Sequence, residues 1–165
     1  MRNFRLAATV AALAASVSFG SAAQAAATAN GTATAEILST LTVTATRSLD
    51  FGQIAVNGAG TLVVATSGST CSALLICTGS ATTAAFDVTG SPDAAYAATV
   101  PATSVALSDG LGNTMTVDNF TAAYTGGTSL VAGAASFEVG GRLTAAAAQP
   151  AGVYSGTFAV SVEYQ

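Results

Sequence analysis

The most regular alternation of apolar and polar residues lies in the last segment of the chain. From Gly152 to Tyr164 every second position is apolar, aromatic or Gly, and the positions between are mostly polar or small. A period of two predicts a β-strand with one buried face. The members of that face are Gly152, Tyr154, Gly156, Phe158, Val160, Val162 and Tyr164.

Shorter stretches with the same period recur along the chain, and pairs of turn-forming residues separate them. No stretch carries apolar residues at helical spacing, and Thr, Val, Ala and Gly dominate. Short strands with frequent turns predict an all-β, immunoglobulin-like β-sandwich. The predicted strands lie around 62–64, 84–88, 115–117 and 135–139, and the predicted turns are Asn57-Gly58, Asp109-Gly110, Gly112-Asn113, Gly126-Gly127 and Gly140-Gly141.

A longer alternation precedes these strands. Between residues 27 and 45 the odd positions carry small or apolar residues, and the even positions are mostly Thr. One straight strand of this length would measure about 60 Å, whereas a domain of this size is only about 35–40 Å across. The stretch must therefore bend, or its first residues must project. We predict a projecting strand over 26–36 and the sandwich over 37–165.

The first 25 residues have the features of a cleaved signal peptide. Arg2 and Arg5 precede an uncharged, Ala-rich run, and Ala23 and Ala25 occupy the positions that signal peptidase requires to be small. We therefore expect export to the periplasm, cell surface or medium. The run is too short and too rich in Ala for a membrane anchor, so no integral membrane segment is expected in the mature chain.

Charge narrows the classes of function. After the leader only Arg47 and Arg142 remain as cations against eight acids, and the chain has neither Lys nor His. Such a balance argues against nucleic acid as a partner. A histidine base and a Ser–Lys pair are absent, and the carboxylates fall on expected strand exteriors and turns, so we expect no enzyme and no cofactor. These carboxylates are Asp87, Asp93, Asp109, Asp118 and Glu138.

Two local features have a structural and a functional interpretation. Cys71 and Cys77 are the only cysteines, and in an oxidising compartment we expect them to form a structural disulfide rather than a redox or metal site. The oxygens between Asp109 and Asn119 could contribute to a calcium site. The same residue types are also common in hairpin turns, and we favour a turn over a calcium site.

The C-terminal segment resembles the last strand of chaperone–usher fimbrial subunits and of spore-coat-U-like proteins. Those subunits commonly have a penultimate Tyr, alternating apolar residues before it, and a Gly fourteen positions from the end; Tyr164 and Gly152 match. The chain is also similar to an uncharacterised secreted family known as domain of unknown function four-four-zero-two. That similarity lies in Leu49–Gly52, Thr114–Phe120 and Val139–Leu143.

The fimbrial resemblance implies donor-strand exchange, in which the N-terminal extension of one subunit completes the sheet of the next. The donor face would be Ala27, Ala29, Gly31, Ala33 and Ala35, and the groove would lie between Gly152–Tyr164 and a strand at 37–43. The expected function is a structural subunit of a surface fibre, pilus or coat. Its partners would be copies of itself or related subunits, with a periplasmic chaperone as a further expected partner.

The alternative expectation is a secreted module that binds carbohydrate or protein in adhesion. Tyr96, Tyr124 and Tyr154 could contribute aromatic faces to such a site, but the chain has no Trp. We expect Tyr96 and Tyr124 to lie in the core or at its rim.

Overall fold

The computed structural model describes residues 27–165, and these contain strands and no helix. The predicted signal peptide, with Ala23 and Ala25, lies outside the described residues. None of the described segments could cross a membrane as a helix. The strands are β1 (Thr42–Arg47), β2 (Gln53–Val56), β3 (Gly60–Ala65), β4 (Gly68–Cys71), β5 (Leu75–Thr78), β6 (Ala84–Thr89), β7 (Tyr96–Thr99), β8 (Val105–Ser108), β9 (Thr114–Thr125), β10 (Ala134–Ala145) and β11 (Ser161–Tyr164).

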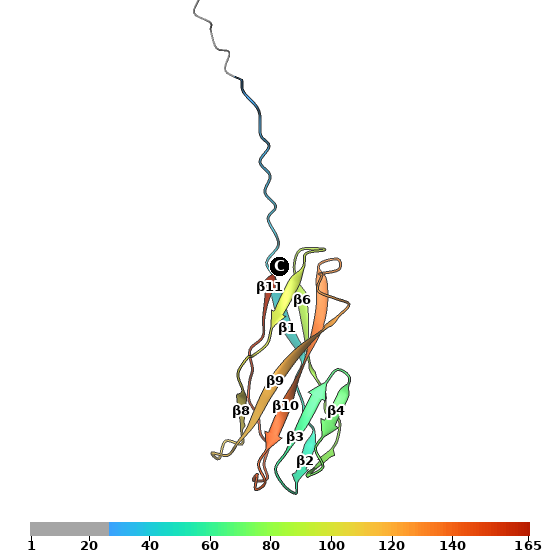
Figure 1. The fold of residues 1–165 in the computed structure, drawn as a ribbon, viewed down its shortest axis with the longest axis vertical. Coiled ribbons are helices and arrows are strands. Elements are labelled where there is room, and N and C mark those ends of the chain that lie inside the picture. The colour runs from blue at the N-terminus through green and yellow to red at the C-terminus, as the bar shows by residue number, and fades with distance from the viewer. Residues whose placement is uncertain (1–26) are drawn as a thin grey trace, which may run out of the picture. The chain divides into compact units, whose positions relative to one another are not determined.

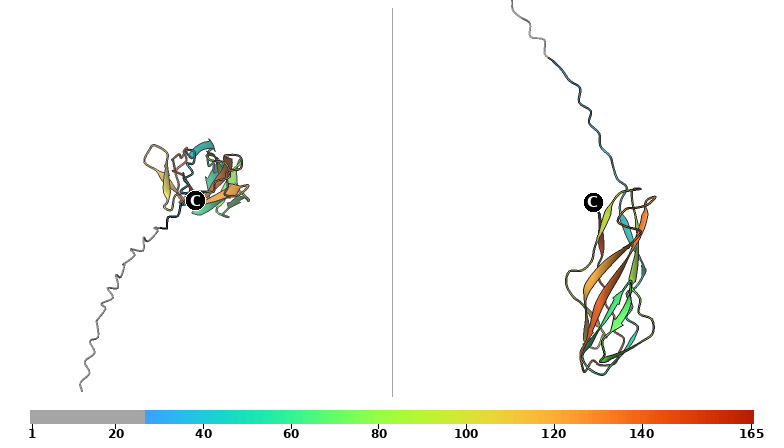
Figure 2. Two further views of the ribbon diagram at one scale, coloured as in Figure 1. Left: turned by 90° about the horizontal axis from the view of Figure 1, so that it is seen from above. Right: turned by 45° about the vertical axis from the view of Figure 1, so that its right-hand side comes forward.

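A curled seven-stranded antiparallel sheet forms the larger layer (Figure 1). Its strands follow the order β1-β6-β10-β3-β4, and β8 and β9 join through β10. The long strand β10 pairs with β6 along its first half, with β3 along its second half, and with β9 on its other edge. Figure 2 shows β9 and β10 running side by side along the domain.

Two short antiparallel ribbons, β7–β11 and β2–β5, complete the sandwich. The core between the layers is apolar, and its most buried members include Val88, Tyr96 and Phe137, each without exposed surface. The strands predicted around 62–64, 84–88, 115–117 and 135–139 each lie within an observed strand. The predicted all-β class and sandwich architecture are confirmed.

One predicted turn is wrong. Gly140 and Gly141 lie in the middle of β10, where the register against β9 shifts. A Cβ at Gly140 would collide with the carbonyl oxygen of Val64 on the neighbouring strand. The pair of glycines therefore permits a close approach of two backbones at a bulge, and it does not reverse the chain.

The N-terminal alternation forms a strand only at its end. Residues 27–40 carry no secondary structure and are exposed, and β1 begins at Thr42 rather than covering 37–43. The chain divides into two units at Ala35/Glu36, and the second holds all of the strands. An alternating pattern gives a strand only where a neighbouring edge supplies hydrogen bonds, and no such neighbour accompanies residues 27–40 among the described segments.

The C-terminal segment with alternating residues also forms a strand over only part of its length. The structure assigns strand to Ser161–Tyr164, which pairs with β7, and an isolated bridge to Ser155. The neighbouring chain leaves the ribbon after Thr99, where Pro101 follows. Proline has no N–H to donate to a ladder, so Gly156–Val160 lose their partner on that side.

Candidate assembly site

The sandwich has an incomplete side between β1 and the C-terminal segment. Strand β1 ends the order of the large sheet and pairs only with β6 among the described strands. In that pairing Val43 lies opposite Val88 and Ala45 lies opposite Phe86, so all four side chains are on the core face. Val88 is buried, but Phe86 is only partly buried and Ala45 is exposed. A core-facing position that remains exposed marks a place where the second layer does not cover the first.

Two aromatic rings form the floor of this opening. Phe86 stacks on the buried ring of Phe137 with the centroids 5.2 Å apart, and it meets Phe158 edge to face at 6.2 Å. Phe158 in turn lies 5.1 Å from Phe120. Phe86 and Phe158 are both partly exposed, so the rings at the edge of the core are accessible there. We use the name lateral groove for the surface that is bordered by β1, Phe86 and residues 156–164.

The backbone on the far side of the lateral groove lacks partners. Tyr154, Phe158, Val160, Val162 and Tyr164 are partly buried while the residues between them are exposed, as a strand with one buried face would be. Gly156–Val160 nevertheless make no backbone hydrogen bonds within the described chain. Beside them a shallow hollow of about 370 Å³ separates residues 157–161 from Val100 and Pro101.

A hydrogen-bonded cluster closes one end of the lateral groove. The Tyr164 hydroxyl donates to the carbonyl oxygen of Ser39 at 2.8 Å and accepts from the backbone N–H of Ser91 at 2.7 Å. The N–H of Ser39 donates to the Ser91 hydroxyl at 2.6 Å. A Cβ at Gly90 would collide with the Tyr164 hydroxyl, so a glycine is required beside it. This Tyr164 cluster fixes the point where the N-terminal segment joins the domain.

The predicted donor residues and the residues of the predicted terminal strand have different local structure. Each donor-face residue is exposed and outside any strand, while the terminal-strand residues line the lateral groove of the domain. Gly152, the first residue of the predicted terminal strand, lies instead in an exposed loop, where a Cβ would rest 3.4 Å from that of Asp109. The donor-face residues are Ala27, Ala29, Gly31, Ala33 and Ala35.

Sequence reasoning missed Ala45, Phe86, Ser39 and Ser91. The alternation included Ala45 among the small or apolar odd positions but gave no sign that the opposing layer would leave it uncovered. Phe86 lies in the strand predicted around 84–88, and its exposure depends on where residues 156–160 lie. Serines 39 and 91 are far apart in sequence and carried no signal.

Three of the five carboxylates considered for catalysis, Asp109, Asp118 and Glu138, accept hydrogen bonds within the domain. Arg142 donates two hydrogen bonds of 2.8 Å to Asp118, which lowers the pKa of that carboxyl group and raises the pKa of the guanidinium. The pKa of Glu138 is lowered by a hydrogen bond from Thr83 and then by Arg47, whose guanidinium lies 2.9 Å away. The Arg142–Asp118 pair connects the neighbouring strands β10 and β9, whereas the Arg47–Glu138 pair connects β1 to β10 across β6.

The Asp109 turn satisfies its own carboxylate. Asp109 accepts hydrogen bonds from the N–H groups of Leu111 and Asn113 and from the Asn113 side-chain amide, and the amide contact lowers its pKa most. Within residues 27–165 no three His, Cys, Asp or Glu side chains gather in a group that could hold a metal ion. The geometry is that of an Asx-type turn between β8 and β9.

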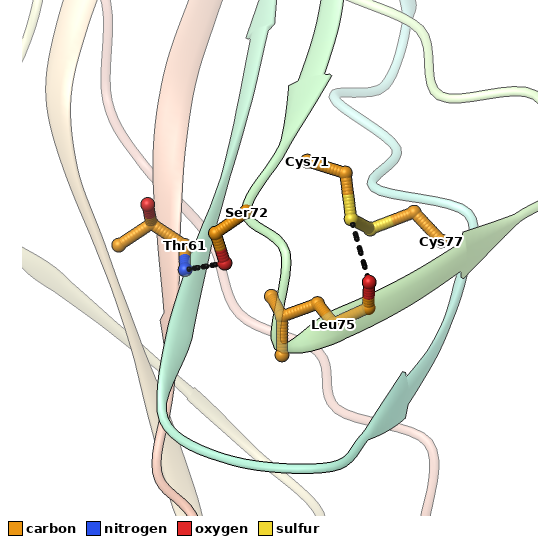
Figure 3. Close-up of a disulfide and its surroundings, with 5 residues drawn as sticks. All are labelled: Thr61, Cys71, Ser72, Leu75 and Cys77. Carbon is orange, nitrogen blue, oxygen red and sulfur yellow. Dashed lines mark hydrogen bonds between the residues drawn. A yellow bond between two sulfur atoms is a disulfide. The ribbon is translucent and has the colours of Figure 1, made fainter.

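The predicted disulfide between Cys71 and Cys77 is confirmed, with the two Cα atoms 6.3 Å apart. It joins β4, at one edge of the large sheet, to β5 of the β2–β5 ribbon (Figure 3). Oxidised sulfur has no proton to donate, so the 3.5 Å approach of Cys71 Sγ to the Leu75 carbonyl oxygen is a contact. Nearby, the Ser72 hydroxyl accepts from the N–H of Thr61 at 3.0 Å. The bridge therefore connects two sheets as well as closing a loop.

A family model described as a domain of unknown function, DUF4402, matches residues 41–164, which include every strand of the domain. No curated protein and no solved structure matches the chain.

Proposed function

We propose a structural role for this chain, which belongs to the DUF4402 family of domains of unknown function. In this proposal it is an exported, non-enzymatic subunit of a surface fibre or coat. Each copy inserts residues 27–35 as a strand into the lateral groove of another copy. The observation that carries the proposal is the exposure of Ala45, a core-facing residue on β1, whose second edge has no partner among the described strands.

The groove offers the backbone groups that strand addition needs. Strand β1 has one unpaired edge, and Gly156–Val160 lack backbone partners, so each offers main-chain groups with which an added strand could form hydrogen bonds. The other edges of the sandwich are less available. Strand β4 is short and covalently joined to β5, and β8 is bridged to Ser155.

The donor segment has the length and side chains that this groove accepts. Residues 27–35 and residues 156–164 are both nine residues long, about 30 Å when extended. Phe86 and Phe158 already touch each other beneath the groove, so little depth remains above them. Ala and Gly fit a shallow groove where Ile or Phe would not. Their small apolar area leaves most of the affinity to the backbone ladder.

The first test is removal of residues 26–36 from the mature chain. We expect the full mature chain to form high-mass assemblies and the shortened chain to be a folded monomer, because the deletion takes away the donor and leaves every strand. Light scattering after size-exclusion chromatography measures mass, and circular dichroism measures folding. A full-length protein that stays monomeric at all concentrations contradicts the proposal.

A matched pair of substitutions tests which face of the donor is buried. Ala33→Glu places a carboxylate on the face that enters the groove, whereas Thr32→Glu places it on the outer face. Burying an unpaired charge is strongly unfavourable, so we expect Ala33→Glu to abolish assembly and Thr32→Glu to retain it. Equal effects from the two substitutions would mean that the segment does not insert as a strand.

A second candidate function is a binding module for carbohydrate or protein. It is favoured by exposed apolar side chains in the loops, of which Leu111 and Val153 retain 87 % and 88 % of their surface. Monomeric protein that is retained on a glycan array or by a partner protein would support this alternative. Self-assembly that depends on residues 27–35 would favour the structural subunit.

A further inference from the structure

The domain has two ends with different surfaces. The terminal end carries the Tyr164 cluster, where the N-terminal segment joins the domain beside the C-terminus. The loop end carries the β8–β9 turn and the loop that follows β10. These two loops are adjacent, because Ser108 and Ser155 exchange backbone hydrogen bonds and Gly152 lies beside Asp109. The twelve-residue strand β9 runs from the loop end to the terminal end, about 40 Å.

Each end exposes large apolar side chains. At the terminal end Ile37 is 95 % exposed and Leu38 is 42 % exposed. At the loop end Leu111 and Val153 are nearly fully exposed. Isolated exposed apolar residues are ordinary on a protein surface, but here both sets lie next to the two ends of the lateral groove.

We infer that Ile37 and Leu38 of one copy pack against Tyr154 and Val153 at the loop end of the next copy. This inference rests on the proposed strand insertion and specifies its direction and register. The occupant of the loop-end surface is therefore a second copy of this chain.

The direction of the inserted donor strand follows from the positions of β1 and β11 at the terminal end of the domain. The end of β11 lies beside Ser39, just before β1, so β1 and β11 run in opposite directions. If the donor runs antiparallel to β11, its last residue lies at the loop end of the acceptor copy. The domain of the donor copy then follows next to that loop end. Subunits joined in this way stand head to tail and can continue indefinitely. The opposite direction would place two terminal ends together and would not extend a fibre.

Register follows from matching faces and lengths. In an antiparallel pair, residues directly opposite each other share a face. Placing the nine donor residues against 156–164 sets Ala33 opposite Phe158 and Ala29 opposite Val162, so the small odd-numbered face meets the inward even-numbered face. The same register continues past the groove and sets Ile37 opposite Tyr154 and Leu38 opposite Val153.

The linker keeps these residues at the junction. Ser39 is held in its own domain by hydrogen bonds to Tyr164 and Ser91. Only Glu36, Ile37 and Leu38 separate Ser39 from the donor segment. These three linker residues span about 10 Å when extended. The next domain must then sit directly against the loop end, so the two apolar side chains cannot avoid that surface.

A cysteine pair tests the register in assembled mature protein. In Leu38→Cys combined with Val153→Cys, the two thiols are at opposite ends of one copy, so a disulfide between them can only join two copies. We expect oxidation to give a ladder of covalent multimers on a non-reducing gel. In the matched control, Leu38→Cys combined with Thr157→Cys, the second cysteine is four residues, about 13 Å, away from the inferred contact. We expect this control to form at least tenfold less covalent multimer.

A second measurement separates this inference from the proposed function. We expect Ile37→Ser to release subunits roughly tenfold faster than the parent assembly, whereas Glu36→Ser should change the rate less than twofold. Assemblies that require residues 27–35 but form no ladder above the control would overturn the register and leave the proposed function standing. An absence of assembly by the parent chain would overturn both.

Discussion

At the scale of single residues, the two tyrosines predicted for the core have different surroundings. Tyr96 is fully buried, and its hydroxyl has no hydrogen-bond partner among the described residues. Burial raises the pKa of Tyr96, with a smaller contribution from Tyr124. Tyr124 meets the Tyr96 ring edge to face at 5.6 Å and accepts a hydrogen bond from the N–H of Ala98 at 2.8 Å. Both rings pack the core, but only one hydroxyl is satisfied.

We therefore expect opposite outcomes from the same chemical change. Tyr96→Phe removes an unpaired buried hydroxyl and should leave the free energy of unfolding unchanged or raise it by up to about 1 kcal/mol. Tyr124→Phe leaves the Ala98 N–H without its acceptor and should lower stability by about 1 kcal/mol. Urea unfolding followed by tyrosine fluorescence measures both. A loss at Tyr96 as large as that at Tyr124 would show that its hydroxyl is engaged.

At the scale of elements, the disulfide links the β2–β5 ribbon to the edge of the large sheet. The ribbon has only four residues in each strand, and its side chains are mostly exposed or half-buried. A short two-stranded ribbon is marginal in isolation, so its place depends on what connects it to the rest of the domain.

Replacing both cysteines with serine should lower the free energy of unfolding by roughly 2 kcal/mol, the value expected for a short closed loop. We also expect faster amide hydrogen exchange in β5 than in β10, since the ribbon loses its covalent tie while the centre of the sheet is unaffected. Exchange that accelerates equally in both strands would mean that the ribbon and the sheet open together.

The sequence predicted elements well where the two-residue period coincided with burial on a paired strand. Phe137 and Val139 alternate in β10, which has neighbours on both sides, and the prediction was correct there. It failed at Gly140 because a glycine pair is equally compatible with a turn and with a bulge. The prediction made the terminal strand too long, because pairing of this strand ends where its partner β7 ends at Thr99. That partner lies more than fifty residues away in the sequence.

At the scale of the whole molecule, the lateral groove was the least predictable feature. Donor and terminal faces were both visible as alternations, but the exposure of Ala45 and Phe86 depends on how two sheets are placed. Local sequence does not specify that placement. The ion pairs were equally hidden, since Arg142 and Asp118 meet only through the register of β9 and β10.

We expect those ion pairs to make the stability of the domain sensitive to acid. The pKa values of Asp118 and Glu138 are lowered in the folded state, so their contribution is present above the unfolded-state pKa of about 4 and is lost as the pH falls through the folded-state values. We expect the melting temperature to be nearly constant from about pH 7 to 5 and to fall below about pH 4.

The double variant Asp118→Asn/Glu138→Gln should melt at a lower temperature at pH 6 and depend less on pH below 4. Asp87→Asn is a suitable control, because Asp87 pairs with neither arginine. Differential scanning calorimetry across this pH range measures all three proteins. An unchanged pH profile in the double variant would assign the acid sensitivity to other groups.

The hydrogen bonds of Tyr164 have a practical consequence for handling the protein. They place the C-terminal strand beside Ser39, where the N-terminal segment joins the domain. The N–H of Gln165 also donates a hydrogen bond to the carbonyl oxygen of Ala95. A purification tag fused after Gln165 would therefore crowd this corner, and we expect it to weaken the proposed self-association through steric hindrance alone. An epitope inserted at the β3–β4 turn, around Ser67, avoids both termini and would allow labelled and unlabelled preparations to be compared fairly.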